Sequence, residues 1–168
     1  MKFKNLLIPL SLLTLLLISV PATTSGSEPS SEPLVFSTWD IFEVDKCASI
    51  WLIKRFIDPK ARIVLYPNGN AITDGIPFDT PDAKFRRYQN ASTYETFMRH
   101  YKIQDDRLLY LGRIIHDIEV NTWGKKAIKE TRNVQNEVNK IITDSKTSTE
   151  VIEKSLLFFD AFYSDLKQ

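Results

Sequence analysis

The fold is indicated most clearly by residues 45–59, DKCASIWLIKRFIDP. Their apolar residues are too dense for the alternation of a half-buried strand, and they leave little room for a solvent-exposed face. This pattern predicts a largely buried helix over 45–57. Asp58 and Pro59 end it, because the residue before a proline is pushed out of the helical conformation.

Short strands are expected on both sides of this helix. Residues 34–39 and 61–66 are short apolar runs, and the second run ends in the turn sequence PNGN at 67–70. The sequence GIPFDTP, residues 75–81, is bounded by prolines and predicts a loop whose Phe78 enters the core.

The second half of the chain is expected to be helical. Ser92 and Glu95 have the spacing of a capping box and open a helix that runs to about Tyr101. Asp105 and Asp106 suit the positive end of the next helix. That helix carries an apolar stripe at three- and four-residue spacing, formed by Leu108, Leu111, Ile114, Ile115 and Ile118.

Two further helices are predicted at 125–142 and 150–166, the second after a capping-box pattern at Thr147 and Glu150. The predicted fold class is therefore mostly α within α+β. We expect a single compact helical domain with two or three short strands in its N-terminal half.

The N-terminus has the features of a secretory signal. Lys2 and Lys4 precede an apolar run over 6–20, and a small-x-small sequence ends at Ala22. The run is shorter than the roughly 20 residues that span a bilayer. We expect a signal peptide at 1–22, a flexible linker at 23–33 and one domain at 34–168, exported to the periplasm or the extracellular space with no membrane span after cleavage. An uncleaved N-terminal anchor is the alternative.

Composition narrows the possible functions. The 168 residues contain 22 Lys and Arg against 21 Asp and Glu, a net charge of +1. This balance argues against a nucleic-acid partner. The chain lacks G-x-S-x-G, H-E-x-x-H, Cys-x-x-Cys and a phosphate-binding glycine loop. Cys47 is the single cysteine, so no intramolecular disulfide can form; it is either a small buried residue, a metal ligand or a reactive thiol.

One candidate site is a metal centre. His116 and Glu119 are three residues apart and share a helix face, and Asp117 lies between them. Asp45 or Cys47 could complete a site for a divalent metal ion of unknown identity. Alternatively, His116 favours the negative end of its helix and the two acids face solvent.

A second candidate is an oxyanion pocket. Guanidinium groups pair with tetrahedral oxyanions as they do with phosphate, and the predicted ligands are Arg55, Arg86 and Arg87. The basic residues also include Lys54, Lys60, Arg62, Lys84 and Arg99, with Trp51, Phe85 and Tyr88 as aromatic neighbours. A solvated basic face is the alternative interpretation.

Three segments in this order resemble a known family. Residues 45–59, the GIPFDTP loop and LGRIIHDIE at 111–119 are similar to the chromate-resistance family, which comprises the C-terminal domain of the chromate-responsive regulator and chromate resistance exported proteins. The polar positions that match are Asp45, Arg55, Asp58, His116, Asp117 and Glu119.

The resemblance implies an exported accessory protein of chromate resistance that binds a small inorganic ion, either a metal or an oxyanion. Two alternatives remain. One is a metal-dependent enzyme of the cell envelope, either a hydrolase or a chromate reductase. The other is a helical protein–protein interaction module.

Overall fold

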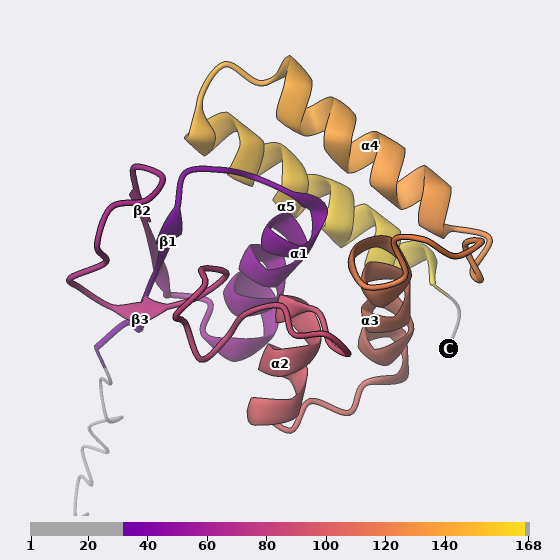
Figure 1. Ribbon diagram of the computed structural model, residues 1–168, viewed down its shortest axis with the longest axis horizontal. Helices are drawn as coiled ribbons and strands as arrows, with labels where there is room; N and C mark the ends of the chain where they lie inside the picture. Colours follow the sequence, from indigo (N-terminus) through magenta and orange to yellow (C-terminus); the bar gives the residue numbers. More distant parts are fainter. Residues whose placement is uncertain (1–31, 167–168) are drawn as a thin grey trace, which may run out of the picture. The chain divides into compact units, whose positions relative to one another are not determined.

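The computed structural model describes residues 32–166 (Figure 1). The elements follow in the order β1 (Val35–Trp39), α1 (Val44–Leu52), η1 (Ile53–Ile57), β2 (Arg62–Tyr66), β3 (Ile76–Pro77), α2 (Thr93–His100), α3 (Asp106–Glu119), α4 (Thr131–Asp144) and α5 (Ser148–Asp165). The α+β class with a small sheet in the N-terminal half is confirmed.

The sheet has three parallel strands in the order β2-β1-β3. β1 lies in the centre, and α1 is the crossover helix between β1 and β2. β3 lies within the segment that was predicted to be only a loop. Ile76 and Pro77 form it by pairing with Phe36 and Ser37, and this contact is too short and too distant in sequence to leave a local pattern. The prediction that Phe78 enters the core is confirmed.

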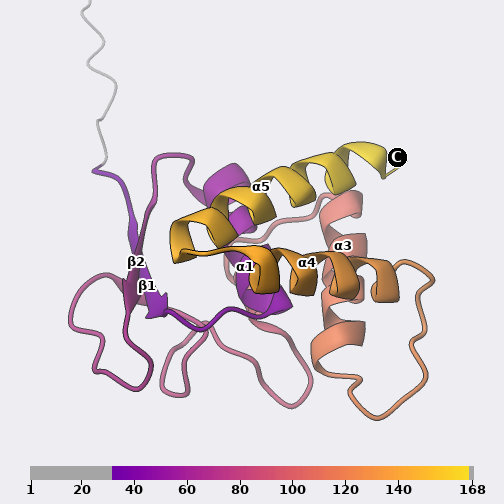
Figure 2. The ribbon, with the colours of Figure 1, turned by 90° about the horizontal axis from the view of Figure 1, so that it is seen from above.

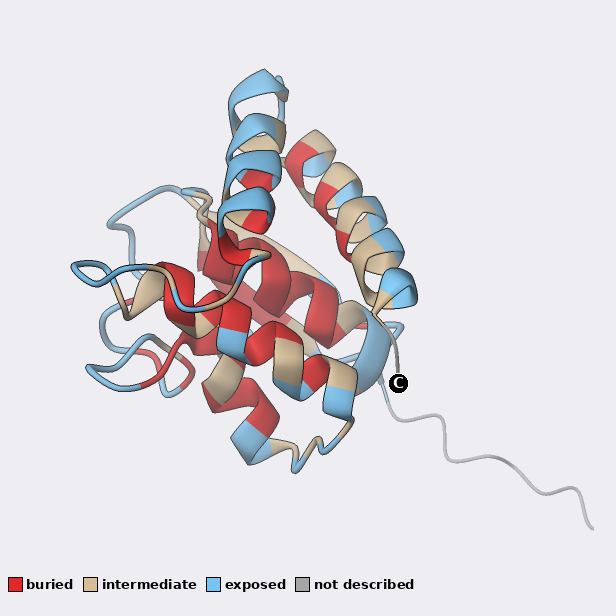
Figure 3. Ribbon diagram, turned by 90° about the vertical axis from the view of Figure 1, so that its right-hand side faces the viewer, coloured by how far each residue is buried: buried red, intermediate tan, exposed pale blue. Residues whose placement is uncertain are grey.

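Helix α1 is the centre of the domain, as the dense apolar pattern predicts. All of its residues are buried, and it contacts α2, α3, α4 and α5. Figure 1 and Figure 2 show α4 and α5 side by side, above α1 in the view of Figure 1, and Figure 3 shows exposed residues along their outer faces. The predicted helix continues as the π-helical turn η1 and ends at Asp58, whose backbone is extended.

The predicted capping box at α2 is confirmed, and Asp105, predicted to lie at the start of the next helix, is the N-cap residue of α3. The amide of Glu95 donates to Ser92 Oγ at 3.2 Å, and the Ser92 amide donates to Glu95 Oε2 at 2.8 Å. Asp105 Oδ1 accepts from the amides of Arg107 and Leu108 at 2.9 and 3.0 Å. The whole apolar stripe of α3 is buried.

Helix α4 begins at Thr131, so the prediction of helix from residue 125 is wrong. Asp117 Oδ2 accepts from the amides of Ala127 and Ile128 at 2.9 and 3.3 Å. Lys126 Nζ meanwhile donates to the carbonyl of Asn121 at 2.9 Å. These contacts with the end of α3 hold residues 125–130 in an irregular conformation.

No helix within 32–166 combines the length and the apolar character needed to cross a membrane. The predicted signal peptide at 1–22 lies outside the described residues, as does the predicted linker up to residue 31. Export and cleavage therefore stay predictions.

Two glycines provide a matched test of the loop between β2 and β3. Gly69 and Gly75 have φ of +82° and +76°, so alanine is strained at both positions by about 1–2 kcal/mol. Only at Gly75 does an added Cβ collide, 2.6 Å from Ser37 Oγ and 2.8 Å from the Val35 carbonyl. We expect Gly75→Ala to lower the free energy of unfolding by about 1–3 kcal/mol more than Gly69→Ala. Urea denaturation measures both, and equal losses would contradict the close packing at Gly75.

Candidate functional site

The topology places a crevice at the end of the sheet where β1 and β3 terminate. In parallel sheets, ligands bind outside the carboxyl ends of the strands, where connections leave a strand in opposite directions. The connection from β1 leads through α1 to β2 on one side, and β3 lies on the other side of β1. Glu43 follows β1 and is the N-cap residue of α1, and Asp79 follows β3.

Two adjoining depressions lie at this end of the sheet. One, of about 210 Å³, is lined by Glu43, Asp79, Thr80, Pro81, Arg86 and Arg87. The other, of about 450 Å³, is lined by Arg86, Arg87, Tyr88, Gln89, Glu119 and Val120. Arg86 and Arg87 line both, and we call the two depressions together the crevice.

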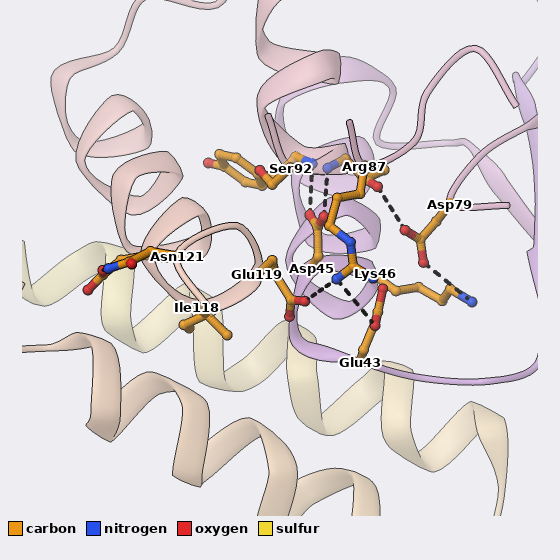
Figure 4. A network of polar contacts seen from close by, with 12 residues as sticks. Glu43, Asp45, Lys46, Asp79, Arg87, Ser92, Ile118, Glu119 and Asn121 are labelled. Atoms are coloured by element: carbon orange, nitrogen blue, oxygen red, sulfur yellow. Dashed lines mark hydrogen bonds and ion pairs between the residues drawn. The ribbon is translucent and has the colours of Figure 1, made fainter. Parts of the chain in front are cut away.

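Arg87 is the centre of the charged groups in the crevice (Figure 4). Its Nη1 lies 2.5 Å from Glu119 Oε2 and 3.8 Å from Glu43 Oε2. The Glu119 side chain is only 10% exposed, whereas those of Arg87 and Glu43 are 43% and 39% exposed. The guanidinium therefore makes one close, shielded contact with the end of α3 and one loose contact with the start of α1.

Asp45, two residues after Glu43, is buried and does not line the crevice. Its carboxylate is fully buried and accepts from the amides of Thr93 and Tyr94 at 2.6 and 2.8 Å. These amides belong to the first turn of α2, where a negative charge is favourable. Burial raises the pKa of Asp45 well above its usual range, and the nearby Asp79 acts in the same direction.

Lys46 joins the two strand ends to α1. Its Nζ is buried, donates to the carbonyls of Trp39 and Ile41, and lies 3.5 Å from Asp79 Oδ2. Asp79 has the left-handed φ of +52°, and its Oδ1 accepts from the Thr93 hydroxyl at 2.7 Å. Asp79 is thus held between α1 and α2 (Figure 4).

The crevice is lined by three carboxyl groups, those of Glu43, Asp79 and Glu119. Burial and the neighbouring Glu43 raise the pKa of Glu119 to about 7, although Arg87 opposes this shift. Burial, with a contribution from Asp79, also raises the pKa of Glu43. The charge of the crevice therefore changes near neutral pH, when Glu119 takes up or releases a proton.

The structure separates the residues of the predicted metal centre. His116 Nδ1 lies 2.9 Å from Glu95 Oε2, and Glu119 contacts Arg87. Asp117 is hydrogen-bonded to the loop before α4 and to the hydroxyl of Thr131, the first residue of α4, at 2.7 Å. In the described part of the chain, no three His, Cys, Asp or Glu side chains are grouped so that they could hold a metal ion.

Cys47 does not supply a thiolate to this region. Its side chain is buried in the core, and burial raises its pKa to about 12. Metals bind the thiolate rather than the thiol, so this group is poorly suited as a ligand. The donors present do not fit a metal centre, and the divalent metal stays a prediction from sequence.

The three predicted oxyanion ligands have different surroundings. Arg55 makes a bidentate pair with Asp160, from Nε at 2.9 Å and from Nη2 at 2.8 Å, and so joins η1 to α5. Arg86 Nη1 donates to the Pro81 carbonyl at 2.5 Å, and its guanidinium carbon lies 4.8 Å from the centre of the Tyr88 ring. Only Arg86 and Arg87 are brought together in the crevice.

The sequence interpretation did not identify Glu43, Lys46 and Asp79. Glu43 and Asp79 could have been found from their position shortly after short apolar runs, because polar groups that follow parallel strands gather at one end of the sheet. That signal required β3 to be identified within GIPFDTP. Lys46 shows no local sign that its ammonium group is buried.

Removing the Asp45 carboxylate tests the buried contact between α1 and α2. Asp45→Ala leaves two buried amides of α2 without an acceptor, and we expect the free energy of unfolding to fall by about 2–4 kcal/mol. Asp105→Ala is the matched control, because Asp105 caps α3 in the same way from a partly exposed position and costs about 1 kcal/mol. Urea denaturation measures the free energy of unfolding of both variants. Equal losses in the two variants would refute the buried contact.

Glu119 predicts a pH dependence of stability. Its pKa is about 7 in the folded protein and near 4.5 when unperturbed, so the folded state holds the proton more tightly. The free energy of unfolding should therefore fall as pH rises from 4.5 to 7, by up to about 3 kcal/mol from this group. Glu119→Gln should flatten this slope, whereas Glu137→Gln on the exposed side of α4 should leave it unchanged. Parallel pH profiles for wild type and Glu119→Gln would contradict the buried carboxyl.

Comparison with known proteins identifies the family. The family described as "ChrB, C-terminal domain" matches residues 36–166. Protein ChrB of Cupriavidus metallidurans is 29% identical over 107 residues, which are 60% of this chain and 33% of that protein. The chain thus spans about a third of this curated relative. No solved structure matches the chain. The matched range includes the carboxyl ends of β1 and β3 and the helices α1 to α5. The chain therefore belongs to the chromate-resistance family of the ChrB C-terminal domain.

Proposed function

We propose that this protein acts in chromate resistance by binding a chromate-like oxyanion in the crevice. The observation that carries the proposal is the position of Arg86 and Arg87, whose side chains line both depressions at the carboxyl ends of β1 and β3. Neighbouring guanidinium groups offer several N–H donors in a planar arrangement that suits a tetrahedral oxyanion.

The contacts of the two arginines leave donors for an anion. Arg86 donates to the carbonyls of Pro81 and Ala83, and it has no carboxylate partner within the described residues. Arg87 faces Glu43 at 3.8 Å, with both side chains more than a third exposed. Exposed ion pairs of this kind contribute little, so an oxyanion can replace Glu43 at small cost.

The fold adds a favourable field. The first turn of α1 begins at Glu43, whose side chain makes no capping hydrogen bond. The N-terminus of α1 is the positive end of its macrodipole. It lies at the same end of the sheet as the two guanidinium groups, an arrangement that favours anions. Glu119 stays beside Arg87 and orients it through the 2.5 Å contact.

Direct titration tests the proposal. Isothermal titration calorimetry of the protein with chromate, and with sulfate for comparison, should give saturable binding at neutral pH. Arg87→Gln should weaken chromate binding about tenfold or more, since a charged hydrogen bond contributes about 1.5–3 kcal/mol.

Two control variants locate the site. Arg55→Gln removes the predicted ligand that pairs with Asp160, and Arg132→Gln removes an exposed arginine of α4. Both should bind chromate as wild type does. Equal weakening in Arg132→Gln and Arg87→Gln would show a general charge effect, and unsaturable binding by the wild type would overturn the proposal.

Export is a further part of this proposal. It is supported by residues 1–22, where two lysines precede an apolar run and a small-x-small sequence. Cell fractionation with an antibody to the protein should find it outside the cytoplasm, shortened at about residue 22. A full-length protein in the cytoplasmic fraction would contradict export.

A further inference from the structure

A further depression lies beside α2 and shares Tyr88 with the crevice. It has a volume of about 390 Å³ and is lined by Lys84, Phe85, Tyr88, Thr96, Arg99 and His100. We call it the basic depression, because its lining includes three basic side chains and no carboxylate. Its size falls in the range of small-molecule sites.

The basic side chains are brought together by the tertiary structure. Lys84 Nζ lies 3.3 Å from His100 Nδ1, although the residues are 16 positions apart. Among the described residues, neither Lys84 nor Arg99 nor His100 forms an ion pair. The depression therefore carries positive charge without a counter-ion, in contrast to Arg87 in the crevice.

Helix electrostatics explains only part of this cluster. Arg99 and His100 belong to the last turn of α2, where cations interact favourably with the macrodipole. Lys84 comes from the irregular segment before Phe85, and the macrodipole gives no reason for its ammonium group to face a histidine. An anion bound between Lys84 and His100 would stabilise both.

Aromatic rings form the rest of the depression. Phe85 is buried, and its ring stacks on Phe97 with centroids 4.3 Å apart. Tyr88 is 42% exposed, its hydroxyl donates to the Lys84 carbonyl at 3.1 Å, and its backbone amide donates to the Ala91 carbonyl at 2.8 Å. The Arg86 guanidinium lies over the Tyr88 ring, and Tyr88 also lines the basic depression, where a planar group can stack on it.

We propose that the basic depression is a second anion site that takes a small phosphomonoester bearing a planar ring. The phosphate lies between Lys84, Arg99 and His100, and the ring packs on Tyr88. Lysine serves as a point charge for phosphate and arginine supplies a planar set of donors. This site does not depend on the oxyanion proposed for the crevice.

Phenyl phosphate is a suitable probe, with inorganic phosphate as the reference. We expect the amide resonances of Lys84, Phe85 and residues 96–100 to shift saturably in NMR titrations, and phenyl phosphate to bind at least threefold more tightly than phosphate. Lys84→Met and Arg99→Gln should each weaken phenyl phosphate at least fivefold. Both side chains are exposed, so thermal unfolding should match the wild type.

Three further variants separate the contributions. Tyr88→Ala should weaken phenyl phosphate and leave inorganic phosphate unchanged. Arg132→Gln on α4 and Arg87→Gln in the crevice should bind phenyl phosphate as wild type does. Unsaturable shifts, or weakening by Arg87→Gln without an effect of Lys84→Met, would overturn the proposal.

Discussion

The buried carboxylate of Asp45 is the interaction on which the crevice depends. A carboxylate in the protein interior is costly unless hydrogen bonds compensate for the loss of water. Here the compensation comes from two amides at the N-terminus of α2, so the central helix and α2 are held together by a polar contact. The hydroxyl of Thr93 then holds Asp79, and Asp79 faces Lys46 on α1 again. The connected contacts position the two strand ends as a unit, because each group left unpaired would be buried without a partner.

Partners, rather than residue type, distinguish the basic side chains of this domain. Arg55 is engaged by Asp160 through Nε and Nη2 and serves to hold η1 on α5. Arg87 shares its charge between a close and a loose carboxylate, which leaves it partly available. Lys84 faces a histidine and an aromatic ring. An anion is attracted most where positive charge is least compensated, so these three residues differ in how available they are to an anion although the sequence makes them look alike.

Local signals in the sequence were reliable where the interaction itself is local. The capping box at Ser92 and the cap at Asp105 join residues two or three positions apart, so their patterns predict the helix starts. The start of α4 was misplaced because Asp117, from the preceding helix, withdraws the amides of Ala127 and Ile128 from the helical pattern. A contact over ten positions leaves no periodic trace.

By itself the sequence determined the buried central helix, the strands beside it, the helix caps and the segments that mark the family. These features arise from the periodicity of apolar residues and from contacts with neighbouring backbone groups. Both can be read from a short segment of sequence. Only the tertiary structure decided that Glu119 meets Arg87, that His116 turns to Glu95 and that Lys84 meets His100. Each of these pairs joins residues 16 or more positions apart, and their charges can be matched only after the helices have packed.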